Sequence, residues 1–511
     1  MLNSVDFSGR PFHFIGIGGI GMSALAYVLT KRRLPVSGSD VRLSHITERL
    51  ETLGAHIFSR QDASNLEFFK SQADLLPTVA VNLASTAVAT VESSVKSRSS
   101  KTESTSALPQ VVCSTAINAA NPEYRAAIEL GCPIFHRSDI LAALIADYQS
   151  IAVAGTHGKT TTSSLISYML LMAGLDPTII IGGEVPAWEG NARQGQSNYL
   201  VAEADESDGS LVKFSPDIGI ITNIELDHPD HYSSLEQVVE TFQTFSSRCH
   251  TVIGSIDCMT VRDRLKPSIS YSLHLESGAD YTVDQIDYHP EGTIACVWER
   301  GQVLGQLSIR LLGEHNLSNA LAAVAVGRLL GLEFAVIAAA IADCEGARRR
   351  FEHRGAFNDI LFIDDYAHHP SEIRATLSSA QIHAGLTTRK RRVVAVFQPH
   401  RYSRILTFLT EFAESFRDAD VVIVSDIYSA GEPDLGQING QQVADSIAKH
   451  HANVYYQPSL QAITRFLDKT LAPGDLTLFL GAGSLNQIIP HVMAHQQGVE
   501  QNSSSEWCRR A

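Results

Sequence analysis

The sequence lacks the cysteine pattern of a disulfide-rich or zinc-binding protein. Its seven cysteines are odd in number, and no pair has CxxC spacing. Scattered cysteines of this kind are typical of proteins from a reducing compartment. The first residues also contain no basic segment followed by an apolar core, so no secretory signal is expected and a cytoplasmic location is predicted.

Long apolar runs and an excess of positive charge are missing as well. The most apolar stretch, 319–342, contains Arg328 and Glu333 and therefore predicts packed helices, with no membrane insertion. Lys and Arg number 40 against 55 Asp and Glu, a formal net charge of −15. So acidic a chain is a poor general binder of nucleic acid or anionic membrane. Any phosphate-bearing ligand must therefore be bound locally, by glycine loops, helix N-termini, single basic side chains or Mg²⁺.

At 511 residues the chain is too long for one hydrophobic core. Short apolar runs at 13–15, 35–39, 150–154, 360–363 and 392–397 each precede a polar or glycine loop or a helical pattern. This alternation predicts βαβ units, mainly parallel sheets and an α/β fold. We place domain boundaries near Gln149 and Gly346. The serine-rich segment 93–106 is expected to be an exposed loop or insertion, and residues 496–511 a poorly ordered tail.

A glycine loop follows the first predicted strand. Residues 16–21 read GIGGIG, the G-x-G-x-x-G pattern, and Asp40 ends the next predicted strand, where a ribose-binding acid would lie. Taken alone, this motif predicts an NAD-dependent oxidoreductase, and a tight turn without a ligand is the plainer alternative. The glycines allow backbone N–H groups to approach a diphosphate. Both NAD and a UDP-sugar carry a diphosphate, so the loop alone does not distinguish them.

A second glycine loop, GTHGKTT, occupies residues 155–161. Val153 stands where the first glycine of G-x-x-x-x-G-K-[ST] belongs, but the strand before the loop and the helix after it are retained. In such a loop backbone N–H groups cradle phosphate oxygens, Lys159 reaches the β- and γ-phosphates, and Thr160 ligates Mg²⁺. The motif predicts nucleoside triphosphate binding, although G-K-T also occurs by chance.

Acidic and imidazole side chains follow two later strands. The predicted strand 199–202 leads into Glu203, and the predicted strand 217–222 is followed by Asp227, His228 and Asp230. Carboxylates and an imidazole beside a triphosphate suit Mg²⁺ ligation. Each residue alone is better explained as a surface acid or a hydrogen-bonded histidine. Their joint occurrence with Lys159 favours a metal site.

The last third contains DDYAHHP at 364–370 and FQPHRYSR at 397–404. Both motifs follow predicted strands, the position at which α/β sheets bind ligands. Arg401 and Arg404 are suited to a carboxylate or phosphate ligand, and a solvated basic loop is the alternative.

Taken in order, these motifs resemble the bacterial Mur ligases from about residue 12 to residue 487. The resemblance implies three domains: an N-terminal Rossmann-like domain for the UDP portion (1–149), a central P-loop ATPase-like α/β domain (150–346) and a C-terminal Rossmann-like domain (347–495). The most similar branch uses ATP and Mg²⁺ to join L-alanine to the lactyl carboxylate of UDP-N-acetylmuramate through an acyl phosphate, in peptidoglycan precursor synthesis. The motifs that carry the resemblance are GIGGIGMS, SGSD, GTHGKTTT, EADESD, TNIELDHPD, GEHNLSNALAA, RRRFEHRG, DDYAHHPSE, FQPHRYSR and GAGS.

The resemblance also implies roles for individual residues. The UDP-sugar set is Gly18, Gly19, Gly21, Ser23 and Asp40. The ATP set is Gly155, Thr156, His157, Gly158, Lys159, Thr160, Thr161, Asn316, Asn319, Arg350 and Asp365. Thr160, Glu203 and His228 are the metal ligands, and Lys159, Glu203 and His228 the catalytic residues. The amino-acid set is Tyr366, His368, His400, Arg401 and Arg404.

One departure and three rival functions qualify these expectations. Many family members carry a carbamate-modified lysine about fifteen residues beyond the histidine of the DHxD motif, and here the stretch VVETFQTF contains no lysine.

The rival functions are an NAD-dependent dehydrogenase, a ligase that adds a whole tripeptide to the same sugar nucleotide, and a non-catalytic nucleotide sensor. GIGGIGMS favours the alanine-adding branch over the tripeptide ligase.

Overall fold

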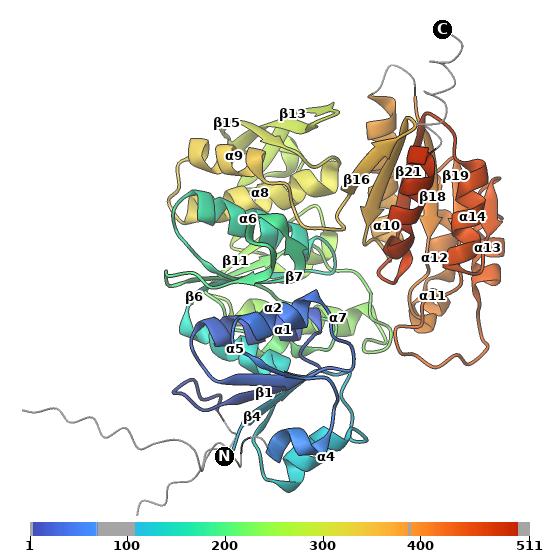
Figure 1. Cartoon of the computed structure of the whole chain (residues 1–511). Helices are drawn as coiled ribbons and strands as arrows, with labels where there is room; N and C mark the ends of the chain where they lie inside the picture. Colours follow the sequence, from blue (N-terminus) through green and yellow to red (C-terminus); the bar gives the residue numbers. More distant parts are fainter. Residues whose placement is uncertain (1–3, 68, 70–107, 387–389, 499–511) are drawn as a thin grey trace, which may run out of the picture. The chain divides into compact units, whose positions relative to one another are not determined.

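The computed structural model describes residues 4–67, 69, 108–386 and 390–498 (Figure 1). The chain divides into two compact units, Met1–Leu141 and Ala142–Ala511. Strands and helices alternate through both units, and the described strands form three sheets whose cores are mainly parallel, which confirms the α/β class. The serine-rich segment 93–106 lies outside the described residues, as does the tail from residue 499 onward.

The first unit contains a five-stranded parallel sheet in the order β3-β2-β1-β4-β5. The order reverses between β1 and β4, and ligands bind at such a switch point beyond the carboxyl ends of the strands. The glycine loop 16–21 follows β1 at this point and leads into α1. The elements are β1 Phe12–Ile15, α1 Ile20–Lys31, β2 Val36–Ser39, α2 His45–Thr52, β3 His56–Phe58, β4 Gln110–Cys113, α4 Pro122–Glu129 and β5 Ile134–His136, followed by α5 Arg137–Asp147, which begins in the first unit and ends in the second.

The second unit begins with a ten-stranded sheet in the order β15-β14-β13-β12-β11-β10-β6-β9-β7-β8. The strand β6 lies between β10 and β9 and is parallel to both, so the loops after these three strands meet at one edge. The strands are β6 Gln149–Ala154, β7 Thr178–Val185, β8 Gly190–Arg193, β9 Tyr199–Glu203, β10 Ile218–Ile221, β11 Thr251–Ser255, β12 Ile269–Tyr271, β13 Tyr281–His289, β14 Gly292–Glu299 and β15 Gln302–Ile309.

Three helices of this region form a buried core. They are α6 Lys159–Met172, α8 Glu314–Leu329 and α9 Phe334–Asp343, which pack against one another (Figure 1). The helix α8 is built mainly from alanine, leucine and valine, and every residue from Asn319 to Gly327 is buried. A helix that is apolar all round belongs in a protein interior. A further helix, α7 Leu235–Arg248, buries one face through Val238, Val239, Phe242 and Phe245.

The second unit ends with a six-stranded sheet in the order β16-β17-β21-β18-β19-β20, of which only β16 is antiparallel to its neighbour. Separate apolar clusters cover its two faces. The strands are β16 Glu352–Phe357, β17 Ile360–Asp365, β18 Arg392–Phe397, β19 Val421–Val424, β20 Val454–Tyr456 and β21 Asp475–Leu480. The helices are α10 Pro370–Gly385, α11 Tyr402–Thr407, α12 Leu409–Glu414, α13 Gly440–Ile447 and α14 Leu460–Thr470.

The predicted strands and their following helices are present, with ends that move by one or two residues. One local expectation is corrected: Asp364 and Asp365 are the last residues of β17 and do not follow it, because both pair with β21. Within the described ranges, no helix has the length and apolar character needed to cross a membrane.

Candidate active site

The loop after β6 has the backbone of a phosphate-binding loop. Gly155 and Gly158 have φ values of 136° and 83°, in the region that favours glycine. A Cβ at Gly155 would lie 1.9 Å from the Thr222 hydroxyl, and one at Gly158 would lie 2.5 Å from Asn319 Oδ1. Both positions therefore require glycine, and the bare backbone of such a loop lets N–H groups approach a phosphate.

The end of β10 fixes the conformation of this loop. The Thr222 hydroxyl donates to the His157 carbonyl at 2.6 Å, and the Asn223 side chain accepts from the His157 N–H at 2.9 Å. Thr222 and Asn223 were not predicted as site residues. Both side chains hold the backbone of the loop through His157 and so help to shape the phosphate site.

Lys159 is held by a buried carboxylate. Its Nζ lies 2.8 Å from Glu206 Oε2 and donates to the Gly155 carbonyl at 2.7 Å. Although burial opposes the charge, Glu206 raises the pKa of Lys159. Burial also raises the pKa of Glu206, to about 7, against the attraction of Lys159. The ammonium group is thus charged and sits inside the loop, where a phosphate oxygen would compete with Glu206 for it.

The predicted metal ligands fall into two neighbouring groups. In the first, the Thr160 hydroxyl donates to Glu203 Oε2 at 3.0 Å, and Glu203 also accepts from the Gly182 N–H at 2.7 Å. A hydroxyl and a carboxylate are hard oxygen ligands of the type that Mg²⁺ prefers. This pair, at the start of α6 and the end of β9, fits a magnesium ion beside the phosphate loop.

The second group contains His228. Its ligand atoms lie within 4.8 Å of those of Asp205 and Glu206. Burial lowers the pKa of His228, so the imidazole is neutral and retains a lone pair. The sequence pointed to Glu203 and missed Asp205 and Glu206, although all three lie in EADESDG. Glu206 links the second group to the phosphate loop, because it contacts both His228 and Lys159.

A cavity of about 550 Å³ opens beside the phosphate loop. Its volume lies within the range of small-molecule sites. Seven of the residues that were predicted to bind ATP line this cavity: His157, Gly158, Thr161, Asn316, Asn319, Arg350 and Asp365. Gly155, Thr156, Lys159 and Thr160 belong to the adjoining loop and are not part of the lining. The lining also includes polar residues that were not predicted, among them Asn223, Glu225, Asp257, His315, Ser371 and Glu372.

Two lining residues belong to the region of the last sheet: Arg350 precedes β16, and Asp365 ends β17. The Asp365 carboxylate accepts from the backbone N–H groups of Phe351 at 2.7 Å and Ala367 at 2.8 Å, and burial raises its pKa to about 6. Arg350 Nη2 lies 3.4 Å from the Thr160 hydroxyl, and its guanidinium covers the Tyr366 ring. Arg350 is therefore close to the phosphate loop, whereas the ATP-binding role of Asp365 stays a prediction.

Four of the five residues that were predicted to bind the amino acid lie close to one another. The Tyr366 and His368 rings lie 5.4 Å apart, and those of His368 and His400 lie 5.6 Å apart. Arg404 Nη1 lies 3.1 Å from His400 Nδ1. Burial lowers the pKa of His368 to about 4 and that of His400 to about 2, so both imidazoles are neutral.

The two arginines of this set have different partners. Arg404 is 2% exposed and binds both carboxylate oxygens of Asp227, at 2.8 and 3.3 Å. Arg401 is half-buried and contacts Asp230 at 3.0 Å and Glu432 at 3.4 Å. The buried two-point pair connects Arg404 to the loop after β10. Arg401 has the looser contacts and is the better placed of the two to exchange them for a ligand.

The glycine loop of the first unit has an acid directly against it. Asp40 Oδ2 accepts from the Gly18 N–H at 2.9 Å, and a Cβ at Gly18 would lie 2.9 Å from the same oxygen. Ser23 is buried, and its hydroxyl donates to the Ile20 carbonyl at 3.0 Å. A Cβ at Gly21 would lie 3.6 Å from Arg137 Nη1, which brings a basic side chain to this loop. The UDP-sugar roles of these residues stay predictions.

The three sheets and the phosphate loop beside a cavity define a multidomain α/β protein of the nucleotide-binding class. The chain belongs to the Mur ligase family. It matches the Mur ligase family catalytic domain over residues 11–149, the Mur ligase middle domain over 153–327 and the Mur ligase glutamate ligase domain over 349–483. These matches confirm the resemblance and the three-domain organisation. The exact boundaries near 149 and 346 stay predictions.

Named relatives extend the similarity over almost the whole chain. A UDP-N-acetylmuramate–L-alanine ligase from Nostoc punctiforme is 68% identical over 493 residues, covering 96% of this chain and 98% of that protein. One from Cyanothece is 61% identical, covering 99% of each chain. Among solved structures, UDP-N-acetylmuramate-alanine ligase from Thermotoga maritima has a TM-score of 0.73 at 26% identity, covering 97% and 99% of the two chains. A murein peptide ligase from Psychrobacter arcticus shares the fold, with a TM-score of 0.65 at 21% identity over 96% and 99% of the chains.

Proposed function

We propose that this chain is an ATP-dependent ligase that joins L-alanine to the lactyl carboxylate of UDP-N-acetylmuramate, in peptidoglycan precursor synthesis. The relatives of 61% and 68% identity carry the name of this activity. The observation in the structure that carries the proposal is Lys159, charged and held in a phosphate loop beside a cavity of about 550 Å³. We place the reaction in the cytoplasm, because it consumes ATP and because scattered cysteines suit a reducing compartment.

The chemistry needs an activated acyl group. A carboxylate is a poor electrophile, so its oxygen first attacks the γ-phosphorus of ATP, forming an acyl phosphate and releasing ADP. The amino group of alanine then attacks the acyl carbon, and the C–O bond to phosphate breaks. The products are the amide, ADP and phosphate. Positioning and charge stabilisation account for most of the acceleration, so no serine or cysteine nucleophile is required.

The phosphate loop supplies the charge stabilisation for the first step. The N–H groups at the start of α6 bind phosphate oxygens, and Lys159 exchanges Glu206 for the γ-phosphate. Thr160 and Glu203 would hold a magnesium ion, with His228 available as a further ligand. Once bound, this ion neutralises charge that develops during phosphoryl transfer.

The amino acid is assigned to the set around His368 and His400. Both rings are neutral, so they add no positive charge beside the incoming ammonium group. We assign the alanine carboxylate to Arg401, whose partners are partly exposed. Arg404 is already bound to Asp227 and is a positioning residue that fixes His400.

Phosphate release from ATP tests the proposal. We expect release only when UDP-N-acetylmuramate and L-alanine are both present, with a product whose mass equals the two substrates minus water. Release with the tripeptide but not with alanine would identify the peptide-adding activity instead. Fluorescence titration with NAD is expected to show no binding. Binding of NAD without phosphate release would favour the dehydrogenase.

A further inference from the structure

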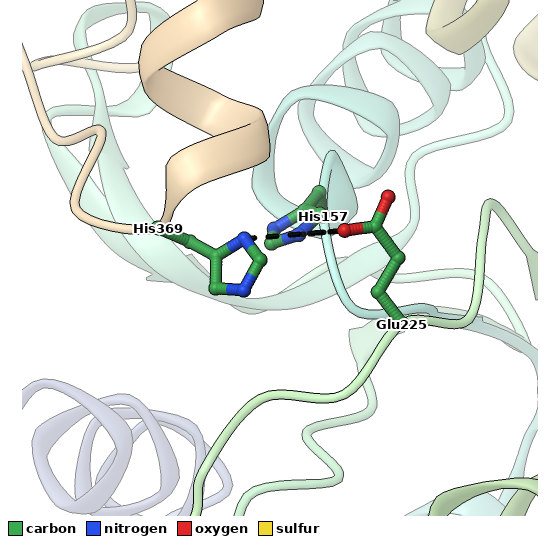
Figure 2. A group of neighbouring side chains, drawn as sticks. All are labelled: His157, Glu225 and His369. Atoms are coloured by element: carbon green, nitrogen blue, oxygen red, sulfur yellow. Dashed lines mark ion pairs between the residues drawn. The ribbon is translucent and has the colours of Figure 1, made fainter. Parts of the chain in front are cut away.

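Three side chains outside the magnesium candidates converge beside the cavity (Figure 2). They are His157 of the phosphate loop, Glu225 after β10 and His369, which caps the N-terminus of α10. His157 Nε2 lies 3.6 Å from Glu225 Oε2, and His369 Nδ1 lies 4.0 Å from the same oxygen. Within the described ranges these residues form one of two groups whose ligand atoms lie within 4.8 Å of one another.

The orientation of His157 is that of a histidine prepared to bind a metal ion. Its Nδ1 lies 3.2 Å from Glu372 Oε1, whereas its Nε2 is buried and has no hydrogen-bond partner. Metal-bound histidines commonly donate their second ring N–H to a carboxylate, which turns the other nitrogen toward the metal. Glu372 occupies this supporting position, and Nε2 faces Glu225.

Distance and charge also suit a metal ion. Ligands about 2.1 Å from a tetrahedral ion lie roughly 3.4 Å from one another. Glu225 Oε2 lies 3.6 Å from His157 Nε2 and 4.0 Å from His369 Nδ1, so these distances need to shorten by a few tenths of an ångström. Glu225 and Glu372 give the cluster two negative charges, of which the protonated His157 balances one, and a divalent cation that replaces this proton would balance both. The Ser371 hydroxyl donates to Glu225 Oε2 at 2.6 Å and steadies the bridging oxygen.

We propose that His157, Glu225 and His369 form a binding site for a divalent transition-metal ion, and that an ion bound there excludes ATP. Two imidazole nitrogens and one carboxylate suit Zn²⁺ and its neighbours, whereas Mg²⁺ prefers oxygen ligands. His157 and Glu225 line the cavity, so the ion joins the phosphate loop to the start of α10 across the ATP site. When the metal–nitrogen bonds form, His157 releases its Nε2 proton, and His369 Nδ1 gives up the hydrogen bond that it accepts from the Ser371 N–H at 3.3 Å.

The binding experiment uses the full-length protein without nucleotide, in millimolar Mg²⁺ to saturate the oxygen-rich groups. Zn²⁺ binding is measured by competition with a chromophoric chelator. His369→Asn removes the imidazole and retains a side-chain oxygen that caps α10. We expect the wild type to bind one Zn²⁺ that the variant binds at least about tenfold more weakly, with Glu225→Gln giving a similar loss. Equal Zn²⁺ binding by wild type and His369→Asn would overturn the proposal.

His495→Asn is the matched control, because His495 is exposed and contacts Asp468 at 3.3 Å, apart from the cluster. It should bind Zn²⁺ like the wild type, and a loss equal to that of His369→Asn would count against a specific site. Co²⁺ provides a spectroscopic check, since its d–d absorption reports tetrahedral coordination, and this band is expected in the wild type and weakened in His369→Asn.

Exclusion of ATP is measured separately and rests on the proposed function. A non-hydrolysable ATP analogue should release Zn²⁺ from the wild type, and added Zn²⁺ should raise the apparent KM for ATP in the wild type more than in His369→Asn. Simultaneous binding of Zn²⁺ and the analogue would overturn this part. Because Zn²⁺ binding needs no turnover, it tests the metal site even if the ligase activity is absent.

Discussion

The ammonium group of Lys159 and the buried carboxylate of Glu206 form an ion pair inside the phosphate loop, with Nζ 2.8 Å from Oε2. Glu206 is only 1% exposed, and Lys159 also donates to a carbonyl of its own loop. The lysine that is expected to bind the γ-phosphate thus already has a strong anionic partner. Nucleotide binding must replace that partner, so we expect Glu206 to lower the affinity for ATP and to stabilise the free protein.

Replacing Glu206 with glutamine removes this competition. We expect Glu206→Gln to bind a non-hydrolysable ATP analogue several-fold more tightly in the absence of Mg²⁺, because Lys159 no longer has to leave a carboxylate. The free variant should also unfold at a lower temperature, since it leaves a buried ammonium group unpaired. Isothermal titration and thermal unfolding measure the two effects. Weaker Mg²⁺-free binding by the variant would contradict the competition.

Removing the lysine tests its assigned role. Lys159→Ala should reduce ATP-dependent phosphate release by at least about a hundredfold, because charge on the γ-phosphate loses its neutralising partner. Circular dichroism is expected to show an intact fold. Lys449→Ala, at an exposed position, is the control and should keep wild-type activity. Activity above a few per cent in Lys159→Ala would overturn the role of this lysine.

The pair between Arg404 and Asp227 predicts a stability effect. Asp227→Asn leaves a buried guanidinium without its counter-charge, which costs about 3–5 kcal/mol in comparable pairs. Thermal unfolding should show a clear loss of stability, and the KM for alanine should rise more than the KM for ATP because Arg404 positions His400. Arg404→Lys should not behave like the wild type, since lysine cannot bind both oxygens in a fork.

The same pair predicts acid sensitivity. Although burial opposes it, Arg404 holds the pKa of Asp227 below its ordinary value. A carboxyl group with a depressed folded-state pKa stabilises the fold above its unfolded-state pKa of about 4, and this stability is lost as the pH falls. The wild type should therefore lose more stability than Asp227→Asn between neutral pH and acid. Parallel acid unfolding curves for the two proteins would contradict this assignment.

His157 predicts the opposite pH dependence. Against the effect of burial, Glu225 and Glu372 raise the pKa of His157 to about 10. A histidine with a raised folded-state pKa stabilises the fold fully below its unfolded-state value of about 6.5, and this stability is lost as the pH rises toward 10. NMR of ¹³C-labelled histidine should show one ring, absent in His157→Gln, that stays protonated at pH about 8. Titration of that ring near neutrality would contradict the assignment.

Much of the architecture could be predicted from local patterns. Apolar runs followed by glycine loops located β1 and β6, and the alanine-rich stretch from Asn319 located buried helices. Such features depend on neighbours in the sequence, which share one strand, turn or helix. For the same reason the phosphate loop was recognised although Val153 replaces its first glycine.

The pairings within the site could not be predicted in this way. Glu206 reaches Lys159 across 47 positions, and Glu372 reaches His157 across 215. No periodicity indicates which carboxylate of EADESDG faces the lysine, because the turn after β9 decides it. Arg404 was predicted as a ligand for the amino acid, whereas its strongest observed contact is Asp227, 177 positions away. These contacts depend on how sheets and loops meet in space.

Transfer of oxygen tests the central claim most directly. UDP-N-acetylmuramate labelled with ¹⁸O in its lactyl carboxylate is incubated with ATP, Mg²⁺ and L-alanine, and the products are analysed by mass spectrometry. An acyl phosphate intermediate moves one carboxylate oxygen into the released phosphate, so the account predicts one ¹⁸O in the phosphate and none in ADP. Phosphate without the label, or label recovered in AMP, would contradict the account.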